Sequence, residues 1–405
     1  MLKRSILATA LMFSAGAMAV SMETRQEYQD NFGLMNFMAA GEQASWYWRN
    51  VEQVLPVARI KRDGEHYMAL ERDLIDPELV YGLKHNDLTL NEMMNGDDYS
   101  INSMIITQNG KVIFEHFNMP YNTQHVWMSN SKIIAGLLVG MLEDEGKVEL
   151  QKSMVTYLPE LKGTAWADIS VYDVLHQQSG MNVLEDAASR QDPNSPVVAL
   201  FLSETGEVDD YYGNLINTKK LYDAGNAFEY GSINTQMMGL LVARVEDKTL
   251  SQVLEERIWS KAGMSADAMM SLTPDGWEVV HGMFVSNTED MARFAMLFTD
   301  SWSATAKERL IPEAVVKNMQ TNYTPGIYLA NEEMGSHFVK MVGEEPAGAA
   351  YQFDAIWEDG DLYKAGLQGQ GIYISPEKNM TAVWFSNRAV SERPAAFIRK
   401  FVSAQ

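Results

Sequence analysis

Ser129 and Lys132 are the residues whose types and spacing could form a catalytic pair. They stand three positions apart at the start of a predicted helix, so their side chains share one face of it. An amine beside a hydroxyl, at the positive end of a helix dipole, can turn the hydroxyl into a nucleophile for acyl transfer. A structural role is the alternative, because a serine can cap a helix and a lysine can lay its apolar stem along one. The four-residue pattern alone does not decide between them.

The helix that carries this pair is predicted over residues 127–143, with Gly146 as its C-terminal cap. Little of its circumference is polar, which is typical of a helix at the centre of a domain. We therefore expect Ser129 to be held by a buried element. The apolar residues that recur at helical spacing, with Val139 between them, are Ile133, Ile134, Leu137, Leu138, Met141 and Leu142.

Two further stretches could supply partners for the pair. Tyr230 precedes an apolar run, and its hydroxyl could move a proton between nucleophile and leaving group. The glycine-rich segment 364–371 could bring backbone close to a substrate and lend an N–H group to an oxyanion. Each has a structural alternative, namely a tyrosine at a helix start and a bulge or tight edge strand. A second S-x-x-K, from Ser375 to Lys378, lies in a turn, where we expect neither side chain to be buried or to face a pocket.

Other kinds of active site find little support in the sequence. It contains no G-x-S-x-G elbow, no glycine loop for phosphates or dinucleotides, and no H-E-x-x-H among its seven histidines. No metal or organic cofactor is therefore expected. His125 is expected to be structural, and Glu185 and Asp186 are expected to be solvated loop acids.

The first nineteen residues have the pattern of a secretory signal peptide. Lys3 and Arg4 precede a mostly apolar stretch, and Ala17-Met18-Ala19 fits the cleavage site. The apolar stretch is too short to be a comfortable membrane span. We expect cleavage after Ala19 and a mature protein in the periplasm or outside the cell, without a membrane span.

Composition bounds the class of protein. The 405 residues are 46% hydrophobic and 10% aromatic, enough for a substantial core in one two-lobed domain or in two domains. The formal net charge of −22 repels phosphate backbones and anionic lipid, so no nucleic-acid partner is expected. The chain has no cysteine, which excludes disulfides, thiol catalysis and thiolate metal sites.

Strand patterns at both ends of the chain, with helical patterns between them, predict an α+β fold: an antiparallel sheet flanked by helices, plus a helical lobe. Residues 20–95 are expected to be a partly helical segment that packs on the main domain, 96–405; whether they cover the cleft is left open. Asn109-Gly110 marks a hairpin within residues 101–117. The other predicted strands are 351–357, 362–365, 371–374 and 381–385. The other predicted helices are 171–177, 237–245, 289–297 behind a capping box opening at Ser286, and 394–402.

Together these residues resemble the motifs of the penicillin-recognising serine hydrolases, which include class C β-lactamases, D,D-peptidases, esterases and nylon-oligomer hydrolases. Ser129-x-x-Lys132 is similar to the first motif of that family, Tyr230-Gly231-Ser232 to the second, and Lys364-Ala365-Gly366 to its Lys-Thr-Gly strand. The resemblance covers about residues 100–400. Supporting stretches of the family kind lie at 173–181, 288–294 and 366–370.

The resemblance implies an antiparallel sheet of about five strands and catalysis through an acyl-enzyme. Ser129 would be the nucleophile, and Lys132 and Tyr230 would share the base and acid roles in a division that the sequence leaves open. The backbone N–H groups of Ser129 and Leu367 would form the oxyanion hole. The residues that would bind the substrate, a small ester or amide, are Ser232, Lys364, Gly366 and Gln368.

Departures from the family pattern favour one of its branches. Ala365 lacks the hydroxyl that helps to hold a β-lactam carboxylate, and Ser232 stands where class C β-lactamases have asparagine. The Gly-Leu-Gln-Gly-Gln sequence of residues 366–370 is more similar to esterases and nylon-oligomer hydrolases. We therefore expect an ester or amide hydrolase. The alternatives are a β-lactamase or D,D-peptidase, and a non-catalytic relative that binds peptide or cell wall.

Overall fold

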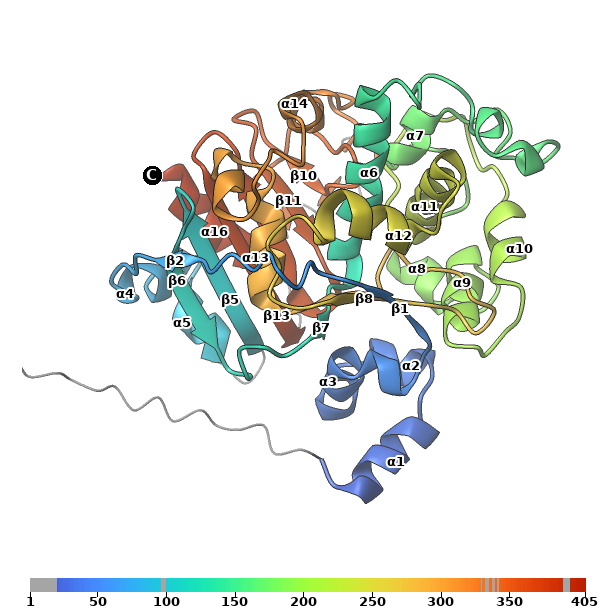
Figure 1. Cartoon of the computed structure of the whole chain (residues 1–405). Coiled ribbons are helices and arrows are strands. Elements are labelled where there is room, and N and C mark those ends of the chain that lie inside the picture. The colour runs from blue at the N-terminus through green and yellow to red at the C-terminus, as the bar shows by residue number, and fades with distance from the viewer. Residues whose placement is uncertain are drawn as a thin grey trace, which may run out of the picture.

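The computed structural model describes residues 20–95, 100–328, 330–331, 335–336, 339–340, 342–388 and 394–405 (Figure 1). The predicted signal peptide, residues 1–19, lies outside the described residues, as does His337. Within the described part, no helix is both long and apolar enough to cross a membrane.

The main sheet is assembled from both ends of the chain, and the predicted α+β fold is confirmed (Figure 1). Its strand order is β10-β11-β12-β13-β5-β6-β2, and the antiparallel pairing of β13 with β5 joins the two ends. It has seven strands, more than the five expected, because β2 and β10 add two-residue strands at its edges. The strands are β2 (Glu71–Arg72), β5 (Ser100–Gln108), β6 (Lys111–Phe117), β10 (Ala355–Ile356), β11 (Leu362–Ala365), β12 (Gly371–Ser375) and β13 (Met380–Arg388).

The turn chemistry of two segments explains where strands form and where they stop. The predicted hairpin at Asn109-Gly110 is confirmed, and both residues have positive φ, +49° and +81°, as a tight hairpin turn requires. The strand predicted over 351–357 is wrong for most of its length, and only β10 forms there. Tyr351 and Gln352 have φ values of +48° and +71°, which a strand cannot accommodate.

A second sheet, which the sequence does not predict, has the order β1-β8-β9-β7. Its strands are two to four residues long, too short to show a period-two pattern. Strand β7 leads the chain directly into the turn that carries Ser129. The strands are β1 (Val57–Ile60), β7 (His125–Val126), β8 (Ala268–Ser271) and β9 (Phe284–Ser286), and a separate pair joins β3 (Lys84–His85) to β4 (Leu88–Thr89).

Helices cover both faces of the main sheet. Alternate residues of β5 enter different cores, since Ile105 belongs to one hydrophobic cluster and Met104 and Ile106 to another. The predicted helices near 171, 237, 289 and 394 are confirmed, but Asn287, not Ser286, caps the third of them by accepting the Asp290 N–H. The helices are α4 (Glu78–Tyr81), α5 (Leu90–Asn95), α7 (Val171–Leu175), α8 (Ala187–Gln191), α9 (Pro196–Glu204), α10 (Tyr211–Ile216), α11 (Ser232–Glu246), α12 (Leu250–Leu254), α13 (Thr288–Met296), α14 (Glu313–Thr321) and α16 (Pro394–Ser403).

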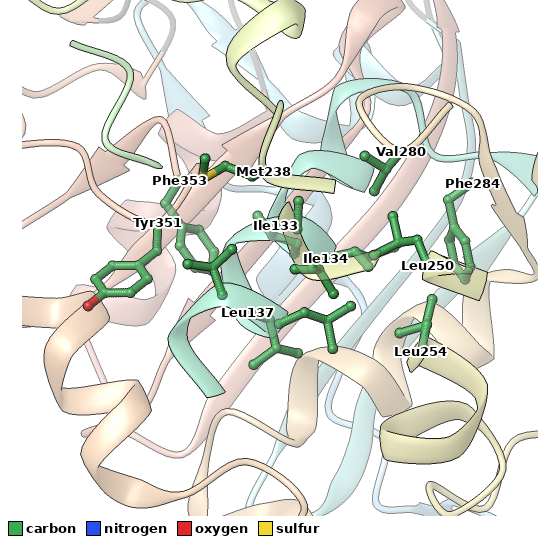
Figure 2. Close-up of a cluster of buried hydrophobic side chains, with 14 of the residues drawn as sticks. Ile133, Ile134, Leu137, Met238, Leu250, Leu254, Val280, Phe284, Tyr351 and Phe353 are labelled. Carbon is green, nitrogen blue, oxygen red and sulfur yellow. The ribbon is translucent and has the colours of Figure 1, made fainter. Parts of the chain in front are cut away.

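Helix α6 (Lys132–Asp144) stands between the main sheet and the helical lobe (Figure 1). Every residue from Lys132 to Leu142 is buried, as predicted, and Gly146 follows the helix with φ +69°. The predicted start is corrected in detail, because Ser129 lies in a 3-10 turn, η2 (Met128–Ser131), that precedes the α-helix. Figure 2 shows apolar side chains gathered around α6, from Tyr351 and Phe353 to Leu250 and Phe284.

Two glycines of α6 let the chain at Tyr351 lie directly against the helix. A methyl group at Gly136 would come within 2.0 Å of the Tyr351 carbonyl oxygen, and one at Gly140 within 3.2 Å of the Tyr351 ring. The Tyr351 hydroxyl then donates a hydrogen bond of 2.6 Å to Glu143. Gly136, Gly140 and Glu143 lie at positions i, i+4 and i+7 on one face of α6, and all three contact Tyr351. They fix α6 against the segment that enters β10.

The N-terminal segment is helical, as predicted, and packs on the second sheet. Its helices are α1 (Met22–Asp30), α2 (Leu34–Met38) and α3 (Glu42–Arg49). Phe37, Trp46, Tyr47 and Trp48, here called the aromatic cap, form a hydrophobic cluster with Val126, Met128 and Val285 that is separate from the two larger cores. The N-terminal segment therefore reaches the turn that carries Ser129.

The second S-x-x-K departs from its prediction in one respect. Ser375 ends β12 and is fully buried, not exposed as expected. Lys378 donates to the Val402 carbonyl oxygen at 2.7 Å, which ties the turn to the C-terminal helix. Ser375 and Lys378 thus have structural positions, in keeping with the prediction of turn chemistry.

We expect Gly136→Ala to lower the free energy of unfolding by about 2 kcal/mol or more. Alanine favours a helix over glycine by about 1 kcal/mol, but a methyl group pressed against a backbone carbonyl costs more than this gain. Urea unfolding followed by circular dichroism measures the difference. Gly64→Ala is the control, since nothing lies within 4 Å of its added carbon. A Gly136→Ala variant as stable as the wild type would contradict the close contact.

Candidate active site

Ser129 is presented by a tightly held turn. Trp127 donates its N–H to the Phe284 carbonyl oxygen at 2.8 Å, and Met128 then takes a φ of +51°, a left-handed conformation that is unusual for a residue with a side chain. Asn130 and Ser131 close the turn with side-chain hydrogen bonds back to Trp127 and Met128, of 3.0 and 2.7 Å. The half-buried Ser129 is therefore fixed in position before any substrate binds.

The amine of Lys132 is fully buried and meets three oxygen atoms. Its Nζ lies 2.8 Å from Ser232 Oγ, 2.9 Å from the His281 carbonyl oxygen and 3.3 Å from Ser129 Oγ. The carbonyl can only accept a hydrogen bond, so one N–H is committed to it. A neutral amine that also donates to Ser232 keeps its lone pair for the third neighbour, the hydroxyl of Ser129.

Burial lowers the pKa of Lys132 to about 7, far below the usual value for lysine. The positive charges of Lys364 and Arg190 lower this pKa further, while the carboxylates of Glu185 and Asp354 act in the opposite direction. At neutral pH a large fraction of the amine is therefore unprotonated and able to accept a proton.

Tyr230 lies between two lysines. Lys364 donates to its hydroxyl at 3.2 Å, and Lys132 Nζ stands 5.1 Å from the centre of its ring. Burial raises the pKa of Tyr230 well above 10, with contributions from the carboxylates of Asp354 and Glu185. A hydrogen bond with the Ser129 side chain has the opposite, smaller effect. Tyr230 is thus a neutral phenol at neutral pH, next to Ser129.

Lys364 is fully buried behind Tyr230, in an ion pair with Asp354 at 2.8 Å. Asp354 also accepts the Ala365 N–H at 2.9 Å, so it fixes both the charge and the backbone of β11. The expected contact of Lys364 with substrate stays a prediction. Sequence reasoning missed Asp354, although a lysine in an apolar strand requires a carboxylate partner and Asp354 is the acid nearest to it in an apolar stretch.

The glycine-rich segment packs against the Ser129 turn, while its close approach to a substrate stays a prediction. A methyl group at Gly366 would lie 2.9 Å from the Asn130 side chain and 3.0 Å from the Trp127 carbonyl oxygen. The next residue, Leu367, lines the same pocket as Ser129. The two N–H groups predicted to form an oxyanion hole thus belong to residues on one pocket. Gln368 has a φ of +59° and donates to the Met38 carbonyl oxygen of α2 at 3.3 Å.

The pocket at Ser129 has a volume of about 50 Å³ and two unlike ends. Around Ser129 and Ser232 its apolar walls come mostly from the N-terminal segment and from methionines: Leu34, Phe37, Met38, Leu55, Met128, Phe201, Met283 and Leu367. Its polar end contains Glu185, Arg190, Glu204, Thr205 and His281. Four residues of the N-terminal segment, all between Leu34 and Leu55, therefore line the pocket.

The polar end contains two buried acids, Glu185 and Glu204, that hold the neighbours of Lys132 in place. Glu185 accepts the Ser232 N–H and pairs with Arg190 at 3.2 Å. Glu204 lies 2.5 Å from the imidazole of His281, and the carbonyl oxygen of His281 binds Lys132. The prediction that Glu185 is a solvated loop acid is wrong, since it is buried. No signal in the sequence distinguished Glu185 from other loop acids.

The remaining candidates have structural positions. His125 is buried, contacts the Val126 carbonyl oxygen through Nδ1 at 2.8 Å and stacks on Phe385, as predicted. Asp186 caps α8 by accepting the Ser189 N–H. Among the residues that the structure describes, no group of three or more histidine or acidic side chains is arranged to hold a metal ion.

Comparison with known proteins places this geometry in a family. Residues 93–404 match the family described as Beta-lactamase. The 6-aminohexanoate-dimer hydrolase of Paenarthrobacter ureafaciens is 23% identical over 355 residues, which are 84% of this chain and 85% of that protein.

Two solved structures share the fold. A candidate 6-aminohexanoate-dimer hydrolase from Bacillus anthracis superposes with a TM-score of 0.74 at 18% identity, covering 93% of this chain and 96% of that one. EstCE1, a hydrolase with promiscuous acyltransferase activity, superposes with a TM-score of 0.56 at 15% identity, covering 75% and 93%. At these identities the likeness concerns the fold.

We expect Asp354→Asn to lower the free energy of unfolding at pH 7 by about 3–5 kcal/mol, because it leaves the buried Lys364 charge without its partner. Urea unfolding measures the loss. Glu71→Gln breaks the exposed pair between Lys111 and Glu71, and its stability should stay close to that of the wild type. Equal stabilities for Asp354→Asn and the wild type would show that Lys364 does not depend on this carboxylate.

Proposed function

The chain belongs to the beta-lactamase family of serine hydrolases, and on that premise we propose that it cleaves an ester or amide bond through an acyl-enzyme on Ser129. The observation that carries this proposal is the buried amine of Lys132, whose Nζ lies within hydrogen-bond distance of Ser129 Oγ, Ser232 Oγ and the His281 carbonyl oxygen. The same arrangement supports Lys132 as the general base and Tyr230 as the general acid.

Acylation begins when Ser129 Oγ attacks the carbonyl carbon and gives its proton to the neutral Nζ of Lys132. Negative charge develops on the carbonyl oxygen, which the backbone N–H groups of Ser129 and Leu367 stabilise. Tyr230 then donates its proton to the leaving oxygen or nitrogen as that bond breaks, and it regains a proton from Lys132. Attack of water on the acyl-enzyme releases the acid and restores Ser129.

The substrate contacts proposed for Ser232, Gly366 and Gln368 follow from their places around Ser129. Ser232 lines the pocket, Gly366 packs on the Ser129 turn, and Gln368 joins this region to α2. Lys364 acts from behind Tyr230, where it holds the phenol in position. We assign no cofactor to this chemistry.

A linear ester or amide is the preferred substrate class. The similarity to a 6-aminohexanoate-dimer hydrolase over most of both chains supports it. So does Ala365, which lacks the hydroxyl that would help to hold a β-lactam carboxylate. A β-lactamase or D,D-peptidase is the second candidate, because the matching family is the beta-lactamase family. A non-catalytic binding role is disfavoured, since Ser129, Lys132 and Tyr230 are all suited to reaction.

The place of action proposed is the periplasm or the exterior of the cell. The support is the pattern of residues 1–19, with basic residues, an apolar stretch and an Ala-x-Ala site. The partner would be a small molecule rather than a nucleic acid, in keeping with the net charge of −22.

A fluorophosphonate probe should label Ser129, and Ser129→Ala should lower turnover of p-nitrophenyl esters and of a linear amide dimer at least about a thousandfold. Mass spectrometry of the labelled peptide identifies the residue, and hydrolysis assays measure turnover. Ser375→Ala is the matched control, because Ser375 begins the second S-x-x-K and does not line the pocket. A probe that labels another residue, with full activity in Ser129→Ala, would overturn the proposal. Nitrocefin turnover far above ester turnover would favour the β-lactamase candidate instead.

The value of kcat/KM should fall about tenfold per pH unit below pH 7, because protonated Lys132 cannot accept the Ser129 proton. Lys132→Arg should abolish turnover at every pH, since arginine keeps its charge. Glu185→Gln should shift the acid limb to lower pH, because the Glu185 carboxylate raises the pKa of Lys132. A profile that stays flat between pH 5 and pH 8 would rule out Lys132 as the base.

A further inference from the structure

The pocket at Ser129 is too small for a substrate with a long apolar chain. Its volume of about 50 Å³ compares with roughly 300–1,000 Å³ for ordinary ligand sites. An ester with an apolar chain therefore needs part of the pocket wall to move.

Most walls of this pocket belong to elements that are fixed on both sides. The Ser129 turn is held by hydrogen bonds within it and to the loop before β9, and Leu367 follows β11, an internal strand of the main sheet. Phe201 belongs to α9 and to the largest core. Displacing any of these would disturb the catalytic geometry or the core itself.

Helix α2 differs from these walls because one side of it faces the pocket and the other side faces solvent. Phe37 is buried and Leu34 and Met38 are half-buried against the pocket, while Met35 on the outer side is 80% exposed. The helix has only five residues, and the glycines Gly33 and Gly41 flank it. Gly41 has a φ of +117°, which only glycine adopts readily, and a carbon added there would meet nothing within 4 Å.

Two hydrogen bonds join α2 to the catalytic domain. The Leu34 N–H donates to the exposed Glu207 carboxylate at 2.5 Å, and Gln368 donates to the Met38 carbonyl oxygen at 3.3 Å. A third, from Trp48 to the Phe37 carbonyl oxygen at 2.9 Å, is buried and joins α2 to α3 across Gly41. Displacing α2 breaks these three hydrogen bonds and exposes Phe37, but it leaves the strands of both sheets paired.

We propose that α2 is a displaceable wall of the Ser129 pocket and that its inward side chains set the length of apolar chain that the site accepts. The proposal rests on the acyl transfer proposed for Ser129. Short acyl groups fit with α2 in place, whereas longer ones require α2 to swing outward about Gly33 and Gly41. The apolar side chains of Leu34, Phe37 and Met38 then line the enlarged site, so the chain that enters is itself apolar.

Substitutions on the two sides of α2 test the proposal. In a series of p-nitrophenyl esters from acetate to decanoate, Phe37→Ala and Met38→Ala should raise the ratio of kcat/KM for octanoate over acetate about tenfold, mainly through KM. Met35→Ala is the matched control, because its side chain points to solvent, and it should leave the ratio unchanged. Met38→Ala keeps the test decisive if Phe37→Ala fails to fold.

The outcomes separate this proposal from the function on which it rests. Normal fluorophosphonate labelling of Ser129 with an unchanged ester ratio in both variants would overturn the role of α2 alone. Absence of labelling and of ester turnover in the wild type would instead overturn the proposed reaction. An equal change in Met35→Ala would show a general loosening of the N-terminal segment and would also reject a specific wall.

Discussion

An amine shielded from water among neutral oxygen atoms is the constraint on which the rest of this structure depends. Nζ of Lys132 meets two hydroxyl oxygens and one carbonyl oxygen, and no carboxylate lies among these three neighbours. A charge held there would be costly, so the pKa of Lys132 falls to about 7. The three oxygens come from the turn before α6, from the start of α11 and from the loop before β9. The fold must bring these distant parts of the chain to one point, and α6, which carries Lys132, is the element that all of them contact.

The site contains a second buried lysine whose surroundings have the opposite effect. Lys364 is paired with Asp354 at 2.8 Å, and it donates to Tyr230 and to a carbonyl oxygen. The carboxylate of Asp354 stabilises a positive charge on Lys364, next to the phenol. The two lysines near Tyr230 thus differ in their contacts, because Lys364 forms an ion pair with a carboxylate while Lys132 Nζ contacts only hydroxyl and carbonyl oxygens. Environments that push similar groups apart in this way commonly mark the division between proton acceptor and positioning charge.

The sequence predicted those features that depend on local pattern. The spacing of Ser129 and Lys132, the Asn109-Gly110 hairpin and the apolar face of α6 each follow from a few neighbouring residues, and the structure has all of them. Features that depend on distant contacts were missed. Asp354 becomes a site residue only when β11 folds back beside it, and Glu185 becomes buried only when its loop meets Ser232. The second sheet was missed because its strands are too short to show a period. The position of α2 over the pocket likewise depends on a tertiary contact between residues more than 300 positions apart.

The aromatic cap and the main cores are separate hydrophobic clusters, and this separation has a consequence for how such a protein changes over generations. Phe37 of α2 belongs to the aromatic cap, while Leu34 and Met38 pack against the largest core as partly buried residues. Substitutions at these three positions change the pocket wall and disturb the buried core less than substitutions within it, so they can accumulate as neutral drift. The groups proposed for catalysis lie outside α2, which is a segment of only five residues.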